Sequence, residues 1–92
     1  MKCRCLIVED EPIARDILRS YISRSGDLEI IGQFGNAISA GEFLRDHAVD
    51  LLFLDIKMPR MSGLDLLRSL PHKPKVVIVS ATTVDDAVLF MT

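Results

Sequence analysis

The sequence predicts an α/β protein built on a doubly wound parallel sheet. Two observations predict this class: four short apolar runs recur along the chain, and amphipathic stretches with helical spacing separate them. Short continuous apolar runs are typical of strands that are covered on both faces. Strands that alternate with helices form parallel sheets joined by right-handed crossovers.

Length and composition restrict the class further. The chain has 92 residues, a net charge of −2 and 49% hydrophobic residues, which fits one domain over residues 1–92. The apolar content excludes disorder, and the absence of a Lys/Arg cluster argues against direct nucleic-acid binding. No apolar run approaches the roughly 20 residues that cross a bilayer, and no signal-peptide pattern is present. We therefore expect a cytoplasmic protein without membrane contact.

The first strand and helix follow from the first two dozen residues. Residues 5–8 form the first apolar run. Pro12 fits the first turn of a helix, because its missing N–H would have no intrahelical partner there. Apolar side chains then recur at helical spacing, with Arg15 and Arg19 on the polar face. Gly26, within Ser-Gly-Asp, marks the turn that follows.

The middle of the chain continues the alternation. A second strand is predicted within residues 28–34, a helix over residues 37–47 and a third strand over residues 51–54, which ends at Asp55. Ser62 and Asp65 have the spacing of a capping box and predict the start of the next helix.

The last segments are a strand and a short helix. Residues 76–79 form the fourth apolar run, which ends at Ser80. Thr83 and Asp86 repeat the capping spacing, so a final helix is predicted over residues 85–91. No fifth apolar run is predicted, which would leave the fourth strand at the edge of the sheet.

Polar side chains follow three of the apolar runs. Glu9 and Asp10 come after the first run, Asp55 after the third and Ser80 after the fourth. Ligands of open parallel sheets bind at the carboxyl ends of the strands, where these side chains would meet. Neighbouring carboxylates repel one another and favour a hard divalent cation such as Mg²⁺. Because an aspartate is also able to accept a phosphoryl group, the pattern predicts metal-assisted phosphoryl transfer to Asp55.

The motifs resemble the receiver domain of two-component response regulators, most closely the LytR/AlgR type. The matching segments are L-I-V-E-D-E-P (6–12), L-F-L-D-I-K-M-P (52–59), S-G-L (62–64) and V-S-A (79–81). The resemblance covers the whole chain. It implies a CheY-like, flavodoxin-like fold with strand order 2-1-3-4.

The resemblance also implies a role for each matching residue. Asp55 matches the phosphoacceptor, Asp10 a direct Mg²⁺ ligand, and Glu9 a ligand that acts through water. Asp55 itself and the backbone carbonyl of Lys57 match the other metal ligands. Ser80 matches the switch hydroxyl that turns toward the phosphoryl group.

Further matches concern access to the site and its shape. Ala81 matches a small residue that leaves room for the phosphoryl donor. Thr82 and the Lys57 side chain match positions that tune dephosphorylation. The segment from Asp55 to Gly63 has the family signature D-x-x-M-P-x-x-x-G, in which Pro59 and Gly63 shape the loop and the start of the following helix.

The implied function is signalling rather than enzymatic turnover. A sensor histidine kinase would phosphorylate the chain in a phosphorelay, and an output domain outside the chain would control transcription. The family's fifth strand, the Lys after it, the aromatic switch residue and the last helix find no match before Thr92. We therefore expect Mg²⁺ binding to be kept and stable activation to be impaired. An exposed fourth-strand edge would also favour self-association.

Two alternatives belong to other functional classes. The chain would be a truncated, non-switching receiver-like module that acts by protein–protein binding; the missing Lys and fifth strand favour this hypothesis. The carboxylates and Ser80 favour the phosphoacceptor instead. A flavin-binding protein is disfavoured, because acidic residues stand where a phosphate-binding loop would be needed.

Overall fold

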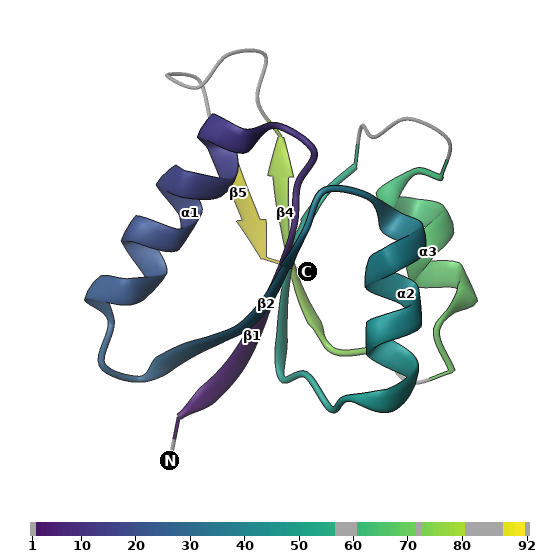
Figure 1. The fold of residues 1–92 in the computed structure, drawn as a ribbon, viewed down its shortest axis with the longest axis horizontal. Coiled ribbons are helices and arrows are strands. Elements are labelled where there is room, and N and C mark those ends of the chain that lie inside the picture. The colour runs from purple at the N-terminus through teal and green to yellow at the C-terminus, as the bar shows by residue number, and fades with distance from the viewer. Residues whose placement is uncertain (1, 57–60, 72, 81–87, 92) are drawn as a thin grey trace.

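The computed structural model describes residues 2–56, 61–71, 73–80 and 88–91, without the side chains of 80 and 88–91. This part of the chain forms one sheet flanked by helices (Figure 1). The elements, in chain order, are β1 (Cys3–Val8), α1 (Pro12–Arg24), β2 (Leu28–Phe34), α2 (Ala37–Asp46), β3 (Leu51–Asp55), α3 (Gly63–Ser69), β4 (Lys75–Ser80) and β5 (Val88–Met91).

The strands lie in the order β2-β1-β3-β4-β5, and the first four are parallel. This confirms the predicted doubly wound fold and the order 2-1-3-4. Parallel pairing brings the carboxyl ends of β1, β3 and β4 to the same edge of the sheet. None of the helices within the described ranges is long and apolar enough to cross a membrane.

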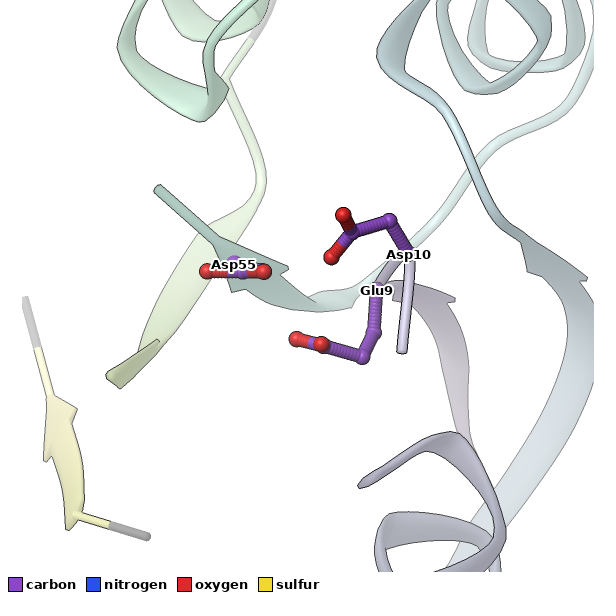
Figure 2. Close-up of side chains that lie close together, drawn as sticks. All are labelled: Glu9, Asp10 and Asp55. Carbon is purple, nitrogen blue, oxygen red and sulfur yellow. The ribbon is translucent and has the colours of Figure 1, made fainter. Parts of the chain in front are cut away.

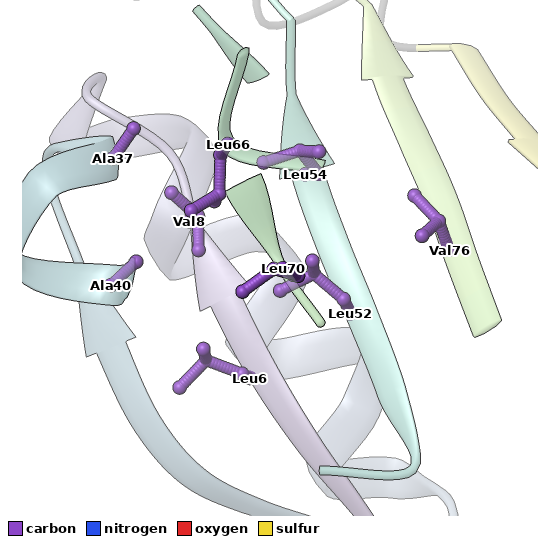
Figure 3. Packing of buried hydrophobic residues seen from close by; sticks show 9 residues of the cluster. All are labelled: Leu6, Val8, Ala37, Ala40, Leu52, Leu54, Leu66, Leu70 and Val76. Atoms are coloured by element: carbon purple, nitrogen blue, oxygen red, sulfur yellow. The ribbon is translucent and has the colours of Figure 1, made fainter. Parts of the chain in front are cut away.

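Helices cover both faces of the sheet, α1 on one face and α2 with α3 on the other (Figure 1). Successive strand residues point to opposite faces, so β1 contributes to two separate cores. Leu6 and Val8 pack with α2 and α3 (Figure 3), whereas Cys5 and Ile7 pack against α1. All four side chains are fully buried. This burial on both faces explains why the strand is a continuous apolar run rather than an alternating one.

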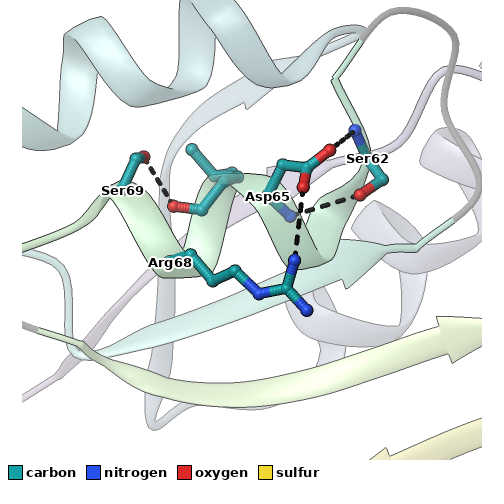
Figure 4. Close-up of polar contacts among 5 residues, drawn as sticks. Ser62, Asp65, Arg68 and Ser69 are labelled. Carbon is teal, nitrogen blue, oxygen red and sulfur yellow. Dashed lines mark hydrogen bonds and ion pairs between the residues drawn. The ribbon is translucent and has the colours of Figure 1, made fainter.

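The predicted capping box begins α3. The Ser62 hydroxyl accepts a hydrogen bond from the Asp65 N–H at 3.2 Å, and the Asp65 carboxylate accepts one from the Ser62 N–H at 3.3 Å (Figure 4). Asp65 also forms an ion pair with Arg68 one turn later. These contacts satisfy N–H groups that the first turn of a helix otherwise leaves unpaired. They fix where α3 starts relative to the end of β3.

The end of the chain differs from the prediction. Residues 88–91 were expected to be helical and instead form β5, which pairs antiparallel with β4 from Ser80↔Val88 to Val77↔Met91. Residues 85–87 lie outside the described part. Val and Phe favour strands, and the open edge of β4 offers backbone partners that an isolated short helix lacks. The predicted exposed edge of β4 is therefore wrong, and with it the basis for self-association through that edge.

Candidate functional site

Three carboxylates meet at the carboxyl edge of the sheet. Glu9 and Asp10 directly follow β1, and Asp55 is the last residue of β3. One carboxylate oxygen from each side chain lies within 4.8 Å of the others. Figure 2 shows the side chains of Glu9 and Asp10 pointing toward Asp55. The structure thus brings together the three acidic residues that the sequence placed at this edge.

Strand register places these carboxylates side by side. Val8 pairs with Leu54 in the parallel ladder, so residues 9 and 55 continue neighbouring strands. The Glu9 N–H donates a hydrogen bond of 2.9 Å to the Phe34 carbonyl of β2. The Glu9 carboxylate accepts one of 3.1 Å from the Glu11 N–H, which fixes its side chain at the turn into α1.

Gly63 lies against the end of β3. Its N–H donates a 3.1 Å hydrogen bond to the Ile56 carbonyl. A Cβ atom at this position would stand 2.5 Å from the Asp55 carbonyl oxygen and 3.0 Å from the Leu54 Cγ atom. Only a glycine fits at position 63, because the backbone there approaches the end of β3 too closely for a side chain. This close approach explains the glycine of the D-x-x-M-P-x-x-x-G motif.

Glu9 is the buried member of the cluster, with 5% of its surface exposed, whereas Asp55 is half-buried and Asp10 exposed. Burial, followed by the negative charge of Asp55, raises the pKa of Glu9 from 4.5 to about 7. The hydrogen bond from the Glu11 N–H opposes this shift. Without a cation, Glu9 of the folded chain is therefore mostly protonated below about pH 7.

The raised pKa predicts a pH dependence of the metal-free chain. Below about pH 4.5 Glu9 is protonated in both states and costs nothing. Between about pH 4.5 and 7 the folded state binds more protons than the unfolded state, so Glu9 lowers the free energy of unfolding as the pH rises. Relative to Glu9→Gln, the wild-type chain should lose about 1–3 kcal/mol between about pH 5 and pH 8 in the presence of a chelator.

Urea unfolding of both chains at the two pH values measures this loss. Glu42→Gln, which neutralises an exposed glutamate on α2, is the matched control and should follow the wild-type curve. Parallel pH dependences of the wild-type and Glu9→Gln chains would contradict a raised pKa of Glu9.

The donor set of this cluster fits a hard divalent cation. It consists of carboxylate oxygens, the ligands that Mg²⁺ and Ca²⁺ prefer. The cluster also concentrates negative charge, which raises the pKa of Glu9 and which a bound cation would neutralise. Glu9, Asp10 and Asp55 are thus able to hold such an ion.

Other residues singled out from the sequence are only partly described. Ser80 ends β4, one position beyond the pair Asp55↔Val79, so its backbone lies at the same edge as the carboxylates; its side chain is not described. Lys57, Pro59, Ala81 and Thr82 lie outside the described residues. Their predicted roles remain predictions.

One contact of the site was not predicted. The Arg15 guanidinium donates a 2.8 Å hydrogen bond from Nη1 to the Glu9 carbonyl oxygen. Helical spacing placed Arg15 on the polar face of α1, together with Arg19, and gave no reason to separate the two. The position of Arg15 in the first turn of α1 could have indicated this contact. Arg15 is only six residues from Glu9, so its side chain is within reach of the end of β1.

Known proteins are similar to this chain in sequence and in fold. The model of the response regulator receiver domain matches residues 5–91. Transcriptional regulatory protein BtsR of Escherichia coli K12 is 41% identical over 80 residues, which cover 85% of this chain and 34% of BtsR. The chain thus spans about a third of the length of the curated relatives it matches.

Solved structures of response regulators superpose well on the sheet and helices. The response regulatory domain of mrkE from Klebsiella pneumoniae is 35% identical, with a TM-score of 0.73 over 82% of this chain and 64% of that one. The MaeR response regulator bound to beryllium trifluoride is 27% identical, with a TM-score of 0.77 over 88% of this chain and 69% of that one. Sequence, fold and acidic edge agree, and the chain belongs to the response regulator receiver domain family.

Proposed function

We propose that Asp55 accepts a phosphoryl group from a sensor histidine kinase, with Mg²⁺ held by Asp10, by Asp55 and, through water, by Glu9. The observation that carries this proposal is the convergence of three carboxylates at the carboxyl edge of a receiver-family sheet. Asp55, which matches the phosphoacceptor of this family, lies at this edge. MaeR, which binds beryllium trifluoride, supports the proposal, because that ion resembles a phosphoryl group in shape and charge.

The chemistry is an exchange of one bond to phosphorus for another. A carboxylate oxygen of Asp55 bonds to the phosphorus, the bond from phosphorus to the donor group breaks, and the leaving group keeps that electron pair. Bound Mg²⁺ supplies charge neutralisation for the phosphoryl oxygens. Asp55 acts as nucleophile, while Asp10 and Glu9 contribute negative charge and ligand oxygens at the same edge.

Burial favours Asp55 over Glu9 as the acceptor. Glu9 has 5% of its surface exposed, so the side chains that enclose it keep a phosphoryl donor away from its carboxylate. Asp55 is half-buried at the end of β3, where a donor is able to approach it while the surrounding carboxylates remain in place.

The remaining assignments extend this proposal. Ser80 would donate a hydrogen bond to the phosphoryl group, and the Lys57 carbonyl would complete the protein ligands of Mg²⁺. Ala81 and Thr82 would set access and dephosphorylation, and Pro59 the shape of the loop. An output domain beyond this chain would control transcription, as the name of the related transcriptional regulatory protein BtsR suggests.

Incubation with acetyl phosphate tests the proposal. The chain is expected to gain one phosphoryl group, detected by intact mass spectrometry, when Mg²⁺ is present and not when a chelator removes it. The adduct should be lost in mild base, as acyl phosphates are. A folded chain that gains no adduct with Mg²⁺, or gains it equally with a chelator, would contradict the proposal.

A further inference from the structure

The peptide between Glu9 and Asp10 is held from the side by α1. Its carbonyl oxygen, that of Glu9, accepts the 2.8 Å hydrogen bond from Arg15 Nη1. The two residues joined by this peptide are the two acidic residues at the end of β1, both part of the carboxylate cluster. A displacement of this peptide would move the Cα atoms of both residues, and with them the side chains that point toward Asp55, so the bond from Arg15 restricts where these carboxylates lie.

Arg15 is itself held on two sides. Its backbone N–H donates to the Glu11 carbonyl at 3.0 Å, which ties the start of α1 to the acidic turn. Its side chain is half-buried beside Gly35, where a Cβ atom would stand only 2.8 Å from Nη1. Arg15 therefore fills the space between the end of β1 and the turn after β2, and a larger residue at 35 would displace it.

The target of the guanidinium is a backbone carbonyl rather than a carboxylate. Within the described residues, Arg15 forms no ion pair with Glu9 or Asp10, although both are close in the sequence. Its exposed neighbour on the helix, Arg19, pairs instead with Asp16. The guanidinium of Arg15 therefore holds the backbone in place and does not neutralise the carboxylates of the cluster.

We infer that Arg15 is a positioning residue that orients Glu9 and Asp10 for Mg²⁺ through the carbonyl of the peptide between them. This inference rests on the proposed function. Residues that orient metal ligands typically change metal affinity by about 10- to 100-fold when they are replaced. A backbone support with one hydrogen bond should lie near the lower end, about tenfold.

A role of Arg15 as a positive charge and a role as a positioning residue predict opposite changes in Mg²⁺ affinity. If Arg15 acted only through its positive charge, its removal would reduce repulsion and tighten Mg²⁺ binding. If it positions the ligands, its removal weakens binding. Arg15→Met keeps the apolar stem and removes the donor, whereas Arg15→Lys keeps a charged donor and should restore part of the affinity. Arg19→Met removes a similar charge from the exposed face of α1 and should bind Mg²⁺ like the wild type.

Titration calorimetry of the whole chain with Mg²⁺, alongside urea unfolding of each variant, tests the inference. Arg15→Met should bind about tenfold more weakly while still folded. Gly35→Ala supplies an independent route, because its Cβ would push Nη1 from the Glu9 carbonyl without removing the charge, and it should also weaken binding. If folded Arg15→Met binds Mg²⁺ as tightly as the wild type or more tightly, the role of Arg15 is overturned while the proposed function stands. If Arg15→Met does not fold, the same result with Gly35→Ala overturns that role. No Mg²⁺ binding by the wild-type chain would overturn the proposed function and this role together.

Discussion

Asp55→Asn is expected to abolish the phosphoryl adduct formed with Mg²⁺ and acetyl phosphate. An amide has no carboxylate oxygen to form the acyl phosphate, and the two neighbouring carboxylates are poor substitutes. Glu9 is enclosed, with 5% of its surface exposed, and Asp10 is proposed to hold Mg²⁺ rather than to attack the phosphorus. Intact mass spectrometry of wild type and variant, treated in parallel, measures the adduct.

The variant should remain folded, because it removes one of three mutually repelling charges. Urea unfolding verifies this, so that loss of the adduct is not confused with loss of structure. Asp46→Asn is the matched control: Asp46 is exposed at the end of α2, at the opposite edge of the sheet, and should leave the adduct unchanged. An adduct of equal yield on folded Asp55→Asn would refute Asp55 as the acceptor.

Gly63→Ala is expected to lower the free energy of unfolding by about 2–3 kcal/mol. The added Cβ would lie 2.5 Å from the Asp55 carbonyl oxygen and 3.1 Å from the Ile56 Cα atom. Both are backbone atoms, which cannot turn away as the end of a side chain would. The end of β3 or the start of α3 must therefore shift, and Asp55 shifts with it. Urea unfolding monitored by circular dichroism measures the loss.

Gly26→Ala provides the comparison. A Cβ at Gly26 meets no atom within 4 Å, so this variant should change the free energy of unfolding only slightly. Gly63→Ala should also give less phosphoryl adduct than Gly26→Ala under conditions where both are folded. A stability loss at Gly63 no larger than that at Gly26 would show that the close approach to β3 is not required.

The order of the elements could be predicted from the sequence because each signal is local. Pro12 and the Ser62–Asp65 capping box are confirmed as helix starts, and the predicted apolar runs lie within β1 to β4. Burial on both faces makes β1, β3 and β4 continuous apolar runs, whereas the edge strand β2 includes the polar residues Glu29 and Gln33.

The last strand was not predicted, although residues 88–91 form an apolar run, V-L-F-M, like those of the other strands. Capping spacing at Thr83 and Asp86 indicated a helix over 85–91. Residues 88–91 form β5 because the edge of β4 supplies hydrogen-bond partners along Val77–Ser80. Such an edge exists only once the sheet has formed, so local capping patterns do not report it.

The acidic site was also predicted only in part, because some of its properties depend on the folded chain. Apolar runs that end in Glu9, Asp10 and Asp55 were enough to place the carboxylates together at one edge. The raised pKa of Glu9 depends on burial that only the folded chain provides. The contact of Arg15 depends on how α1 lies beside β1, and its helical spacing is the same as that of many solvent-exposed arginines.

The most direct measurement of the central claim is the position of the phosphoryl group. The wild-type chain, treated with acetyl phosphate and Mg²⁺, is reduced with borohydride to convert the acyl phosphate to a stable alcohol, then digested and sequenced by tandem mass spectrometry. The conversion is predicted at Asp55, at the end of β3, and only in samples that contained Mg²⁺. Conversion at Glu9, Asp10 or any other carboxylate in place of Asp55 would contradict the account.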